Sequence, residues 1–242
     1  MSAAINIAVV ICAAGASSRM KNEGSAVRKK EYEKLNNGNT VLGTAAAAFA
    51  SVPDVQVIVI SVPKDGENAA RSALPANLLS SKNPKLLFVT GGDTRQKSVF
   101  NALSVLADFS PDYALIHDGA RPWVSTSLIE NIITAVKKHN AVIPLLPLTD
   151  TPKECDSSLE TQTNNDASAV FIKNHLKRKN TGIAQTPQAF KFPEILNAHK
   201  QAANESEEFT DDAEIWGRFC GQVAVIPGEH ENRKITFPGD LI

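Results

Sequence analysis

Short apolar runs alternate along the chain with segments whose apolar residues recur at helical spacing. The runs are nearly continuous and rich in β-branched residues, a pattern typical of strands covered on both faces in a parallel sheet. A late run at 223–226 predicts one further strand. The main runs occupy residues 5–12, 55–62, 85–89, 113–117 and 141–146.

Two helices are predicted between these strands, because their apolar residues return every three or four positions. Ser127 followed by Glu130 has the pattern of a capping box and is expected to open the second helix. The apolar faces comprise Val99, Leu103 and Leu106 in the first helix and Leu128, Ile132 and Val136 in the second.

Helical patterning returns at 192–203, where Pro193 suits the first turn. It returns again at 210–220, where Gly221 suits the position just after the last turn. Strands that alternate with helices imply right-handed crossovers between parallel strands. The sequence therefore predicts an α/β fold, a three-layer sandwich with a mostly parallel sheet.

The stretch 149–180 departs from this pattern, since it is polar apart from a short apolar island at 169–172. A polar excursion of this length inside a domain is usually functional or mobile. It is compatible with a disordered loop, an inserted lobe, or an arm that packs on a partner.

Composition narrows the class of protein. The chain has 242 residues, 43% of them hydrophobic, enough for a sizeable core in one large domain or two small ones. Its 25 Lys and Arg residues nearly balance its 26 Asp and Glu residues, so the formal net charge is −1. This balance argues against a general nucleic-acid binder, and the hydrophobic content argues against a disordered chain.

The cysteines and the N-terminal segment indicate the cellular compartment in which the protein is expected. The cysteines at 12, 155 and 220 are odd in number and form no CxxC motif. No disulfide framework or zinc site is therefore expected, and a reducing cytoplasm is the simplest setting. The apolar stretch at 5–14 is too short to span a membrane and no basic segment precedes it, so neither a membrane span nor a signal peptide is expected.

Small and charged residues follow the first strand. Residues 13–17 are small, so their backbone N–H groups can approach a phosphate without obstruction, and Arg19 adds a guanidinium with suitable donor geometry. An ordinary strand-to-helix turn with a surface arginine explains the same residues. The basic triplet at 28–30 is a candidate second phosphate clamp or a solvated surface.

Two further clusters follow later strands. Residues 91–98 (GGDTRQKS) combine a double glycine with Arg95 and Ser98, which favours a loop that contacts a base or sugar, although Asp93 or Thr94 also suits a helix cap. Residues 117–122 (HDGARP) place a carboxylate where a Mg²⁺ ligand or ribose acceptor is expected. A local salt bridge between Asp118 and Arg121 is the competing interpretation, and a role in the fold is favoured for the histidine.

These segments together resemble a known family. AAGxxxRM, GGxxRxxSV, HDGARP, QTPQAF and NRKIT occur in this order, and the resemblance spans essentially residues 5 to 241. They are similar to the 2-C-methyl-D-erythritol 4-phosphate cytidylyltransferases. The resemblance implies a single nucleotidyltransferase domain over 1–242, Rossmann-like and of the nucleotide-diphospho-sugar transferase type. It also implies an extended β-arm at about 147–185 that interlocks two subunits.

The resemblance further implies a reaction and residue roles. CTP and a polyol phosphate would give a CDP-polyol and pyrophosphate with Mg²⁺, and Asp118 would contact the metal. The catalytic cations would be Arg19, Lys30 and Lys234. The nucleotide-binding residues would be Ala13, Ala14, Gly15, Gly91, Gly92, Asp93, Ser98 and Asp118. The substrate-binding residues would be Arg121 and Thr186, with Thr151 and Arg178 reaching the polyol phosphate from the partner subunit's arm.

The sequence departs from the family pattern in three places. Ser17 replaces the second glycine of the GxGxRM loop, and the stretch 21–29 is longer than is typical. Lys30 rather than Lys29 is assigned as the phosphate clamp, because Lys30-Glu31-Tyr32 matches the family's Lys-Gln-Tyr. The sequence ends at Ile242 without a segment matching the family's last helix.

Two alternatives remain open at this stage. Ribitol-5-phosphate cytidylyltransferase shares the site chemistry and differs in the polyol pocket. A non-catalytic nucleotide-binding protein of the same fold would be expected to lose a phosphate clamp. A metal-dependent glycosyltransferase would need a DxD carboxylate pair, which residues 117–119 do not provide.

Overall fold

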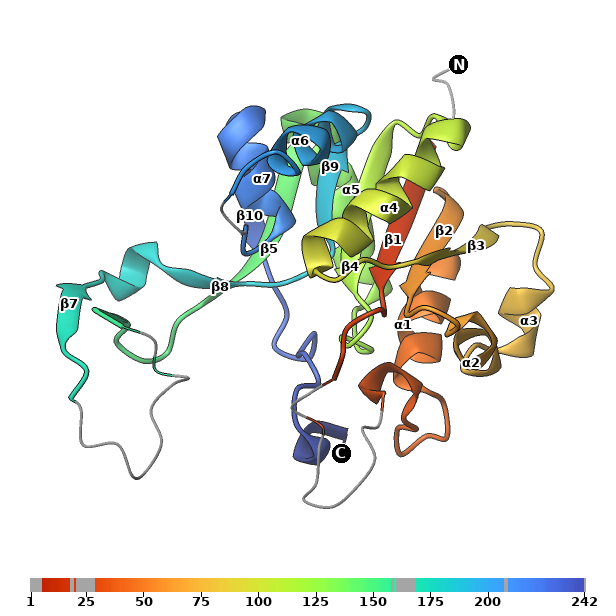
Figure 1. Cartoon of the computed structure of the whole chain (residues 1–242), viewed down its shortest axis with the longest axis horizontal. Helices are drawn as coiled ribbons and strands as arrows, with labels where there is room; N and C mark the ends of the chain where they lie inside the picture. The colour runs from red at the N-terminus through yellow and green to blue at the C-terminus, as the bar shows by residue number, and fades with distance from the viewer. Residues whose placement is uncertain are drawn as a thin grey trace.

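A computed structural model describes residues 6–17, 20, 29–157, 159, 169–206 and 209–241. Within these residues an eight-stranded sheet runs in the order β10-β5-β9-β4-β1-β2-β3, with β8 added beside β5 (Figure 1). The strands are β1 (Ile7–Cys12), β2 (Val55–Val62), β3 (Lys85–Thr90), β4 (Tyr113–Asp118), β5 (Ala141–Pro147), β8 (Gly182–Ala184), β9 (Gln188–Lys191) and β10 (Ala224–Pro227).

The sheet is parallel except at two strands. β9 runs antiparallel between β4 and β5, pairing Leu115 with Ala189 and Val142 with the same residue. β8 is antiparallel to β5, with Leu145 opposite Ala184. This arrangement confirms the expected mostly parallel sheet, while β8 and β9 were not predicted as strands.

Helices cover both faces, because alternate residues of each central strand point to opposite sides. Val9 and Ile11 pack with α1 and α5 on one face, whereas Ala8 and Val10 pack with α4, α6 and α7 on the other. The three-layer prediction is therefore confirmed. The helices are α1 (Val41–Ala50), α2 (Glu67–Ser72), α3 (Ala76–Leu79), α4 (Arg95–Leu106), α5 (Thr126–His139), α6 (Glu194–Ala202) and α7 (Asp212–Phe219).

Two predicted helix starts were wrong. Ser125, not Ser127, caps α5: its backbone is extended and its hydroxyl accepts the N–H of Leu128 at 2.9 Å. Three hydroxyl residues in a row compete for this position, and the one whose backbone stays extended acts as the cap. Pro193 precedes α6 rather than lying in its first turn.

Short 3-10 turns complete the described elements. They are η2 (Lys30–Tyr32), η3 (Ala107–Phe109), η5 (Arg178–Asn180) and η6 (Pro238–Leu241). None of the helices in the described ranges combines the length and apolar character that crossing a bilayer requires.

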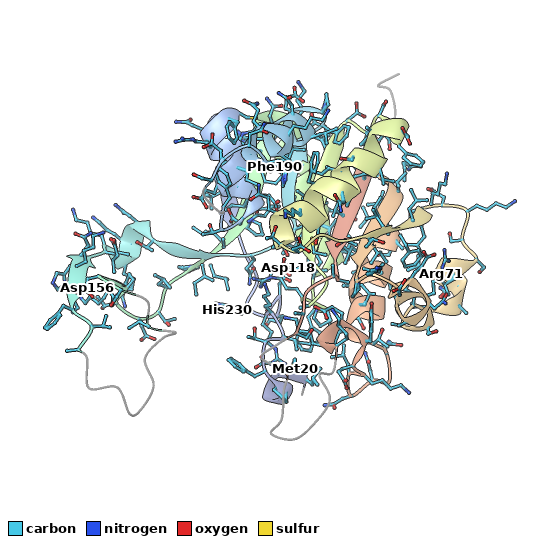
Figure 2. All side chains as sticks on the ribbon, in the orientation of Figure 1. Met20, Arg71, Asp118, Asp156, Phe190 and His230 are labelled. Atoms are coloured by element: carbon cyan, nitrogen blue, oxygen red, sulfur yellow. The ribbon has the colours of Figure 1, made fainter. Side chains whose placement is uncertain are left out.

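Between β5 and β8 the chain leaves the sheet and forms a projection, here called the arm (described residues 148–157, 159 and 169–181). Its strands β6 (Lys153–Cys155) and β7 (Ile172–His175) pair antiparallel with each other and not with the main sheet. Figure 1 shows β7 far to the left of the sheet, and Figure 2 shows Asp156 out on the arm while Asp118 lies near the centre of the molecule.

Candidate functional site

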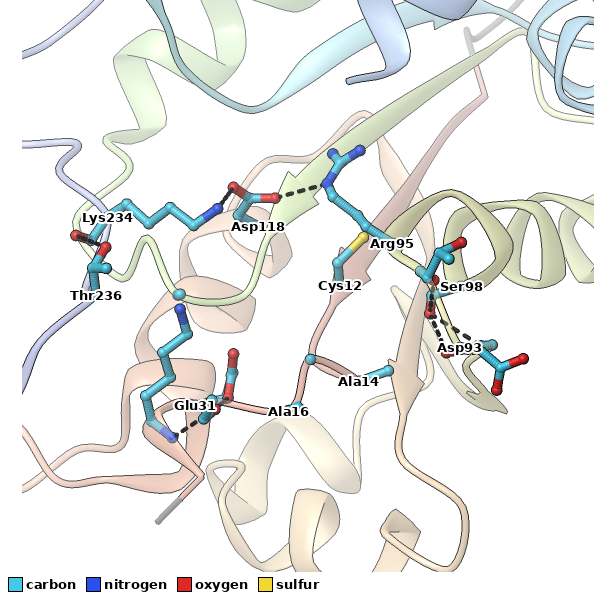
Figure 3. A pocket seen from close by; sticks show the side chains of 16 residues that line it. Cys12, Ala14, Ala16, Glu31, Asp93, Arg95, Ser98, Asp118, Lys234 and Thr236 are labelled. Carbon is cyan, nitrogen blue, oxygen red and sulfur yellow. Dashed lines mark hydrogen bonds and ion pairs between the residues drawn. The ribbon is translucent and has the colours of Figure 1, made fainter. Parts of the chain in front are cut away.

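A cavity of about 350 Å³ opens where β1 and β4 end (Figure 3). Parallel strands bring the loops that follow them to one edge of a sheet, which is where ligands bind in open α/β folds. Segments distant in sequence therefore meet here. The lining includes residues 14–17 after β1, Lys30 and Glu31 of η2, 92–95 and Ser98 at the start of α4, Asp118 at the end of β4, and Lys234.

Asp118 lies among three cations: Arg95, Lys234 and, in the local salt bridge considered above, Arg121, whose Nε is 3.8 Å from Asp118 Oδ2. The Nε of Arg95 donates to its Oδ1 at 3.2 Å, and the Nζ of Lys234 donates to its Oδ2 at 2.8 Å. Burial alone would raise the pKa of Asp118, but Arg95 and Lys234 outweigh it and hold the pKa well below its ordinary value. The cavity thus contains a carboxylate that stays ionised.

Arg95 joins this carboxylate to a second one that sequence analysis did not assign. Its Nη2 donates to Asp212 Oδ2 at 2.7 Å, and His199 Nε2 lies 3.2 Å from the other oxygen of Asp212. Asp212 and His199 are both fully buried. Asp212 also has its pKa lowered, since Arg95 and His199 outweigh its burial. Asp212 follows the cap residue of α7, and nothing in the sequence links it to Arg95.

His117 and Thr186 belong to a chain of hydrogen bonds next to the cavity. The N–H of Asp118 donates to Thr186 Oγ1 at 3.0 Å, this hydroxyl lies 3.1 Å from His117 Nδ1, and His117 Nε2 lies 3.0 Å from the carbonyl of Arg121. A neutral imidazole protonated on Nε2 satisfies every partner. Burial lowers the pKa of His117 to about 4, so the neutral form is present at pH 7. The expected structural role for this histidine fits that geometry.

The segment that carries Lys234 is fixed by Asn232. The side-chain amide of this fully buried residue donates to the carbonyl of Thr186 at 2.8 Å, and its backbone carbonyl accepts from Arg121 Nη1 at 2.8 Å. Burial also lowers the pKa of Arg121. Lys30 Nζ donates to the carbonyl of Ile235 at 3.0 Å, so it reaches the same segment.

The loop after β1 is packed against the loop after β3. A Cβ at residue 91 would overlap the methyl of Ala14 and lie 2.7 Å from Ser98 Oγ, so only glycine allows this approach. Ser98 accepts the N–H of Gly92 at 3.1 Å. Thr94 caps α4, since its hydroxyl accepts from Lys97 N at 3.1 Å. Asp93 is thereby left exposed at the cavity rim.

The structure does not bring every assigned residue to the cavity. Arg19 lies outside the described residues. Thr151 and Arg178 are exposed on the arm, where Arg178 Nη1 donates to the carbonyl of Thr149 at 2.6 Å. Four other assigned residues do not line the cavity: Ala13, Gly91, Arg121 and Thr186.

The described residues contain no cluster of three or more Cys, His, Asp or Glu side chains that could hold a metal by themselves. Asp118 offers one ionised carboxylate at the cavity. Mg²⁺ is commonly held by one or two carboxylates together with substrate phosphates. The donor set therefore fits a magnesium ion that arrives with a polyphosphate ligand.

Comparison with known proteins places this geometry in context. Residues 7–242 match the family model described as "IspD: 2-C-methyl-D-erythritol 4-phosphate cytidylyltransferase". A bifunctional enzyme IspD/IspF of Bradyrhizobium sp. is 38% identical over 238 residues, covering 97% of this chain and 54% of that protein. One from Bartonella henselae is 35% identical over 241 residues, with 98% and 55% covered. The chain thus spans about half the length of the curated relatives it matches.

Solved structures resemble the fold over nearly its full extent. The 4-diphosphocytidyl-2C-methyl-D-erythritol synthase of Anaerococcus prevotii superposes with a TM-score of 0.78 at 27% identity, covering 98% of this chain and 93% of that one. The Francisella tularensis 2-C-methyl-D-erythritol 4-phosphate cytidylyltransferase gives 0.73 at 28%, with 98% and 96% covered. Since the family model matches almost all of the sequence, this chain belongs to the 2-C-methyl-D-erythritol 4-phosphate cytidylyltransferase (IspD) family.

Proposed function

We propose that the chain transfers the cytidylyl group of CTP to 2-C-methyl-D-erythritol 4-phosphate, giving 4-diphosphocytidyl-2-C-methyl-D-erythritol and pyrophosphate for isoprenoid biosynthesis. Family membership supports the reaction. The observation that carries it is the convergence of Lys30, Lys234 and the small-residue loop on one cavity beside an ionised carboxylate. Such a cavity can hold two phosphate groups close together.

The chemical step needs no general base. An oxygen of the polyol phosphate, already anionic at pH 7, attacks the α-phosphorus of CTP. The bond from that phosphorus to the bridging oxygen breaks, and its electron pair leaves with pyrophosphate. The barrier comes from repulsion between anions and from charge gathering on the leaving oxygens, so positioning and electrostatic stabilisation dominate catalysis.

Cations supply that stabilisation in the proposal. Lys30 and Lys234 line the cavity from opposite ends of the chain, and Arg19 is assigned with them from the family motif. The bare amides of residues 14–16 would cradle phosphate oxygens. Mg²⁺, held by Asp118 and the nucleotide's own phosphates, would neutralise part of the triphosphate charge. Arg95 and Lys234 keep Asp118 ionised for that contact.

Selection of cytosine would come from the segment 91–98. Gly92 and the residues that follow it bring backbone groups to the cavity in a rigid frame, because the Gly92 N–H is bonded to Ser98 and α4 is capped by Thr94. A base edge read by fixed backbone groups is discriminated by hydrogen-bond pattern. CTP is therefore expected to be preferred over UTP and ATP.

The arm is proposed to pair two copies of the chain. Phe171 and Ile172 on the arm, and Ile183 beside it in β8, are each more than half exposed, at 66%, 53% and 52%. None of the three belongs to a core cluster of the described residues. Apolar surface on a projection is stabilised when a second copy covers it. Thr151 and Arg178 would then reach the polyol phosphate in the other subunit's cavity. A cytoplasmic setting is part of the same proposal, since the three cysteines are unpaired.

Pyrophosphate release tests the reaction. Purified protein is given CTP and Mg²⁺ with 2-C-methyl-D-erythritol 4-phosphate, or with ribitol 5-phosphate as the competing acceptor. We expect release with the first acceptor at least tenfold faster than with the second. Faster release with ribitol 5-phosphate would replace the proposed acceptor, and release with neither would refute the proposed activity.

A further inference from the structure

The loop at 14–17 is tied to the segment 29–31 by contacts that the proposed reaction does not use. Ser17 Oγ donates to Glu31 Oε2 at 3.2 Å and accepts the N–H of Lys30 at 3.4 Å. Lys29 Nζ donates to the carbonyls of Ala14, at 3.3 Å, and Gly15. We call these contacts the loop clasp.

Ser17 has a backbone conformation that needs support. Its φ is +51°, in the left-handed region that is unfavourable for residues other than glycine. Its hydroxyl has two partners, Glu31 and the Lys30 N–H, and these bonds offset the backbone cost. The loop geometry at this residue therefore depends on a side chain from η2.

Glu31 is unusual for a cavity that receives anions. Its side chain is 3% exposed, yet it belongs to the lining, where a carboxyl group opposes phosphate binding. Burial raises its pKa, despite the nearby ammonium groups of Lys30 and Lys29. An acidic residue in this place needs another role, and its contact is with Ser17.

Lys29 acts on the same loop from the other side. Its ammonium binds backbone carbonyls instead of facing the cavity, and burial lowers its pKa. The C=O and N–H of a peptide unit point in opposite directions. Because Lys29 binds the carbonyls of Ala14 and Gly15, the N–H groups of the same peptide units point away from Lys29. The clasp thus fixes the loop at both ends, at Ala14–Gly15 and at Ser17.

We propose that Glu31 is a positioning residue that acts through Ser17, holding the loop 14–17 in the form that binds the nucleotide triphosphate and setting its distance from Lys30. This inference rests on the proposed function. Lys30 shares in the clasp through its own N–H, so the loop amides and the Lys30 ammonium form one preassembled unit. Loss of the clasp weakens CTP binding and leaves the acceptor site unchanged.

Steady-state kinetics on Glu31→Ala, Glu31→Gln, Ser17→Ala and the Ser17→Ala/Glu31→Ala double variant test the clasp. Removing a hydrogen bond to a charged group predicts a rise of about tenfold in the KM for CTP in Glu31→Ala. The KM for the polyol phosphate is expected to stay within about twofold, a split that general loss of structure would not give. Glu31→Gln keeps an acceptor for Ser17 and is expected to restore most of the CTP affinity.

The double variant measures coupling. If Glu31 acts through Ser17, removing both costs no more than removing one, so the KM of the double variant matches that of Ser17→Ala within about twofold. A matched control exists away from the cavity, where Ser125 Oγ donates to Glu229 Oε1 at 2.7 Å. Glu229→Ala breaks the same type of contact and is expected to lower the melting temperature with the KM for CTP unchanged.

Two results would overturn the clasp. One is a KM for CTP in Glu31→Ala that is no higher than in Glu229→Ala. The other is a double variant in which the KM for CTP rises by the product of the two single-variant factors. If Glu31→Ala does not fold, Ser17→Ala and Glu31→Gln give the same comparison. Wild-type protein without CTP turnover would refute the proposed function instead, and calorimetric CTP binding by the same variants would then decide the clasp separately.

Discussion

The hydroxyl of Thr186 lies 3.1 Å from His117 Nδ1 and accepts the backbone N–H of Asp118 at 3.0 Å. It thereby joins the segment before β9 to the end of β4, where the carboxylate of Asp118 lies in the cavity. The orientation of Asp118 depends on a hydroxyl 68 residues away in sequence. This relationship lets a substrate-binding role for Thr186 be separated from a positioning role.

Thr186→Val keeps the shape of the side chain and removes both hydrogen bonds. Because it leaves a buried N–H and a buried ring nitrogen without partners, we expect unfolding free energy to fall by about 1–3 kcal/mol. Urea denaturation measures this loss, and Thr186→Ser, which keeps the hydroxyl, is the control. A variant that retains full stability but raises the KM for the polyol phosphate would instead support direct substrate contact.

Acid should destabilise the protein through His117. Its pKa is about 4 in the fold and 6.5 in its ordinary state, so the unfolded chain takes up the proton first as pH falls. The stability that neutral His117 provides is present above pH 6.5 and is lost progressively toward pH 4. Between pH 7 and pH 5 this predicts a loss of about 2 kcal/mol.

His117→Asn isolates that contribution, since it removes the titrating ring. Urea unfolding at pH 7 and pH 5 should show a smaller pH dependence in the variant than in the wild type. Glu31 has a raised pKa, so its contribution to stability falls as pH rises, opposite to that of His117. Because Glu31 is present in both proteins, its effect cancels in the comparison. Equal pH dependence in the two proteins would remove His117 as the cause.

Arg95 should be required for stability as well as for the site. Arg95→Met leaves Asp212, which is fully buried, without its guanidinium partner, so we expect about 3–5 kcal/mol of destabilisation. Lys97→Met on the same helix is the control, because its side chain is 62% exposed and pairs with exposed Asp93. The control is expected to change stability by less than about 0.5 kcal/mol. Similar losses in both variants would contradict the bridging role of Arg95.

Lys234→Met should impair chemistry more than binding. Removing one preorganised charge that meets the transition state often lowers the rate by about 10²–10³. Lys30→Met is expected to act similarly, and exposed Lys138 on α5 provides a matched Lys→Met control with unchanged kcat. Single-turnover measurement of pyrophosphate release gives the rate. A normal kcat in Lys234→Met would remove this residue from the catalytic set.

If the arm completes the site of a second copy, two inactive variants should complement each other. Lys234→Met disables the cavity and Arg178→Ala disables the arm, so a mixed dimer holds one intact site. Random pairing predicts activity of about one quarter of wild type after subunit exchange. Light scattering reports the mass in parallel. No recovery, together with a dimeric mass, would place Arg178 outside the partner's site.

The central strands were predictable because burial on both faces requires continuous apolar residues. β2 matches its expected bounds, Val55–Val62, and β5 extends only one residue beyond 141–146. β9 escaped prediction since it is four residues long and contains a buried polar Gln188. α1 escaped too, because its run of alanines gives no contrast between faces.

The cavity was predictable to the extent that each lining loop follows a strand. Gly15, Gly92 and Asp118 line it for that reason. Contacts made only by tertiary folding were not predictable, above all Arg95 with Asp212, which are 117 residues apart. The sequence shows that Ser17 stands where the family has glycine. Its positive φ and its hydrogen bond to Glu31 depend on the folded structure and could not be predicted.

The arm begins and ends on adjacent strands, since β5 and β8 pair at Leu145 and Ala184. An insertion whose two ends are already held side by side adds little chain-closure entropy whatever its length. The arm can therefore be exchanged between homologues as a module that leaves the main sheet and its cavity intact. If the arm pairs two copies and reaches the acceptor as proposed, then evolution, or a chimera, can alter acceptor preference and subunit pairing together in one segment.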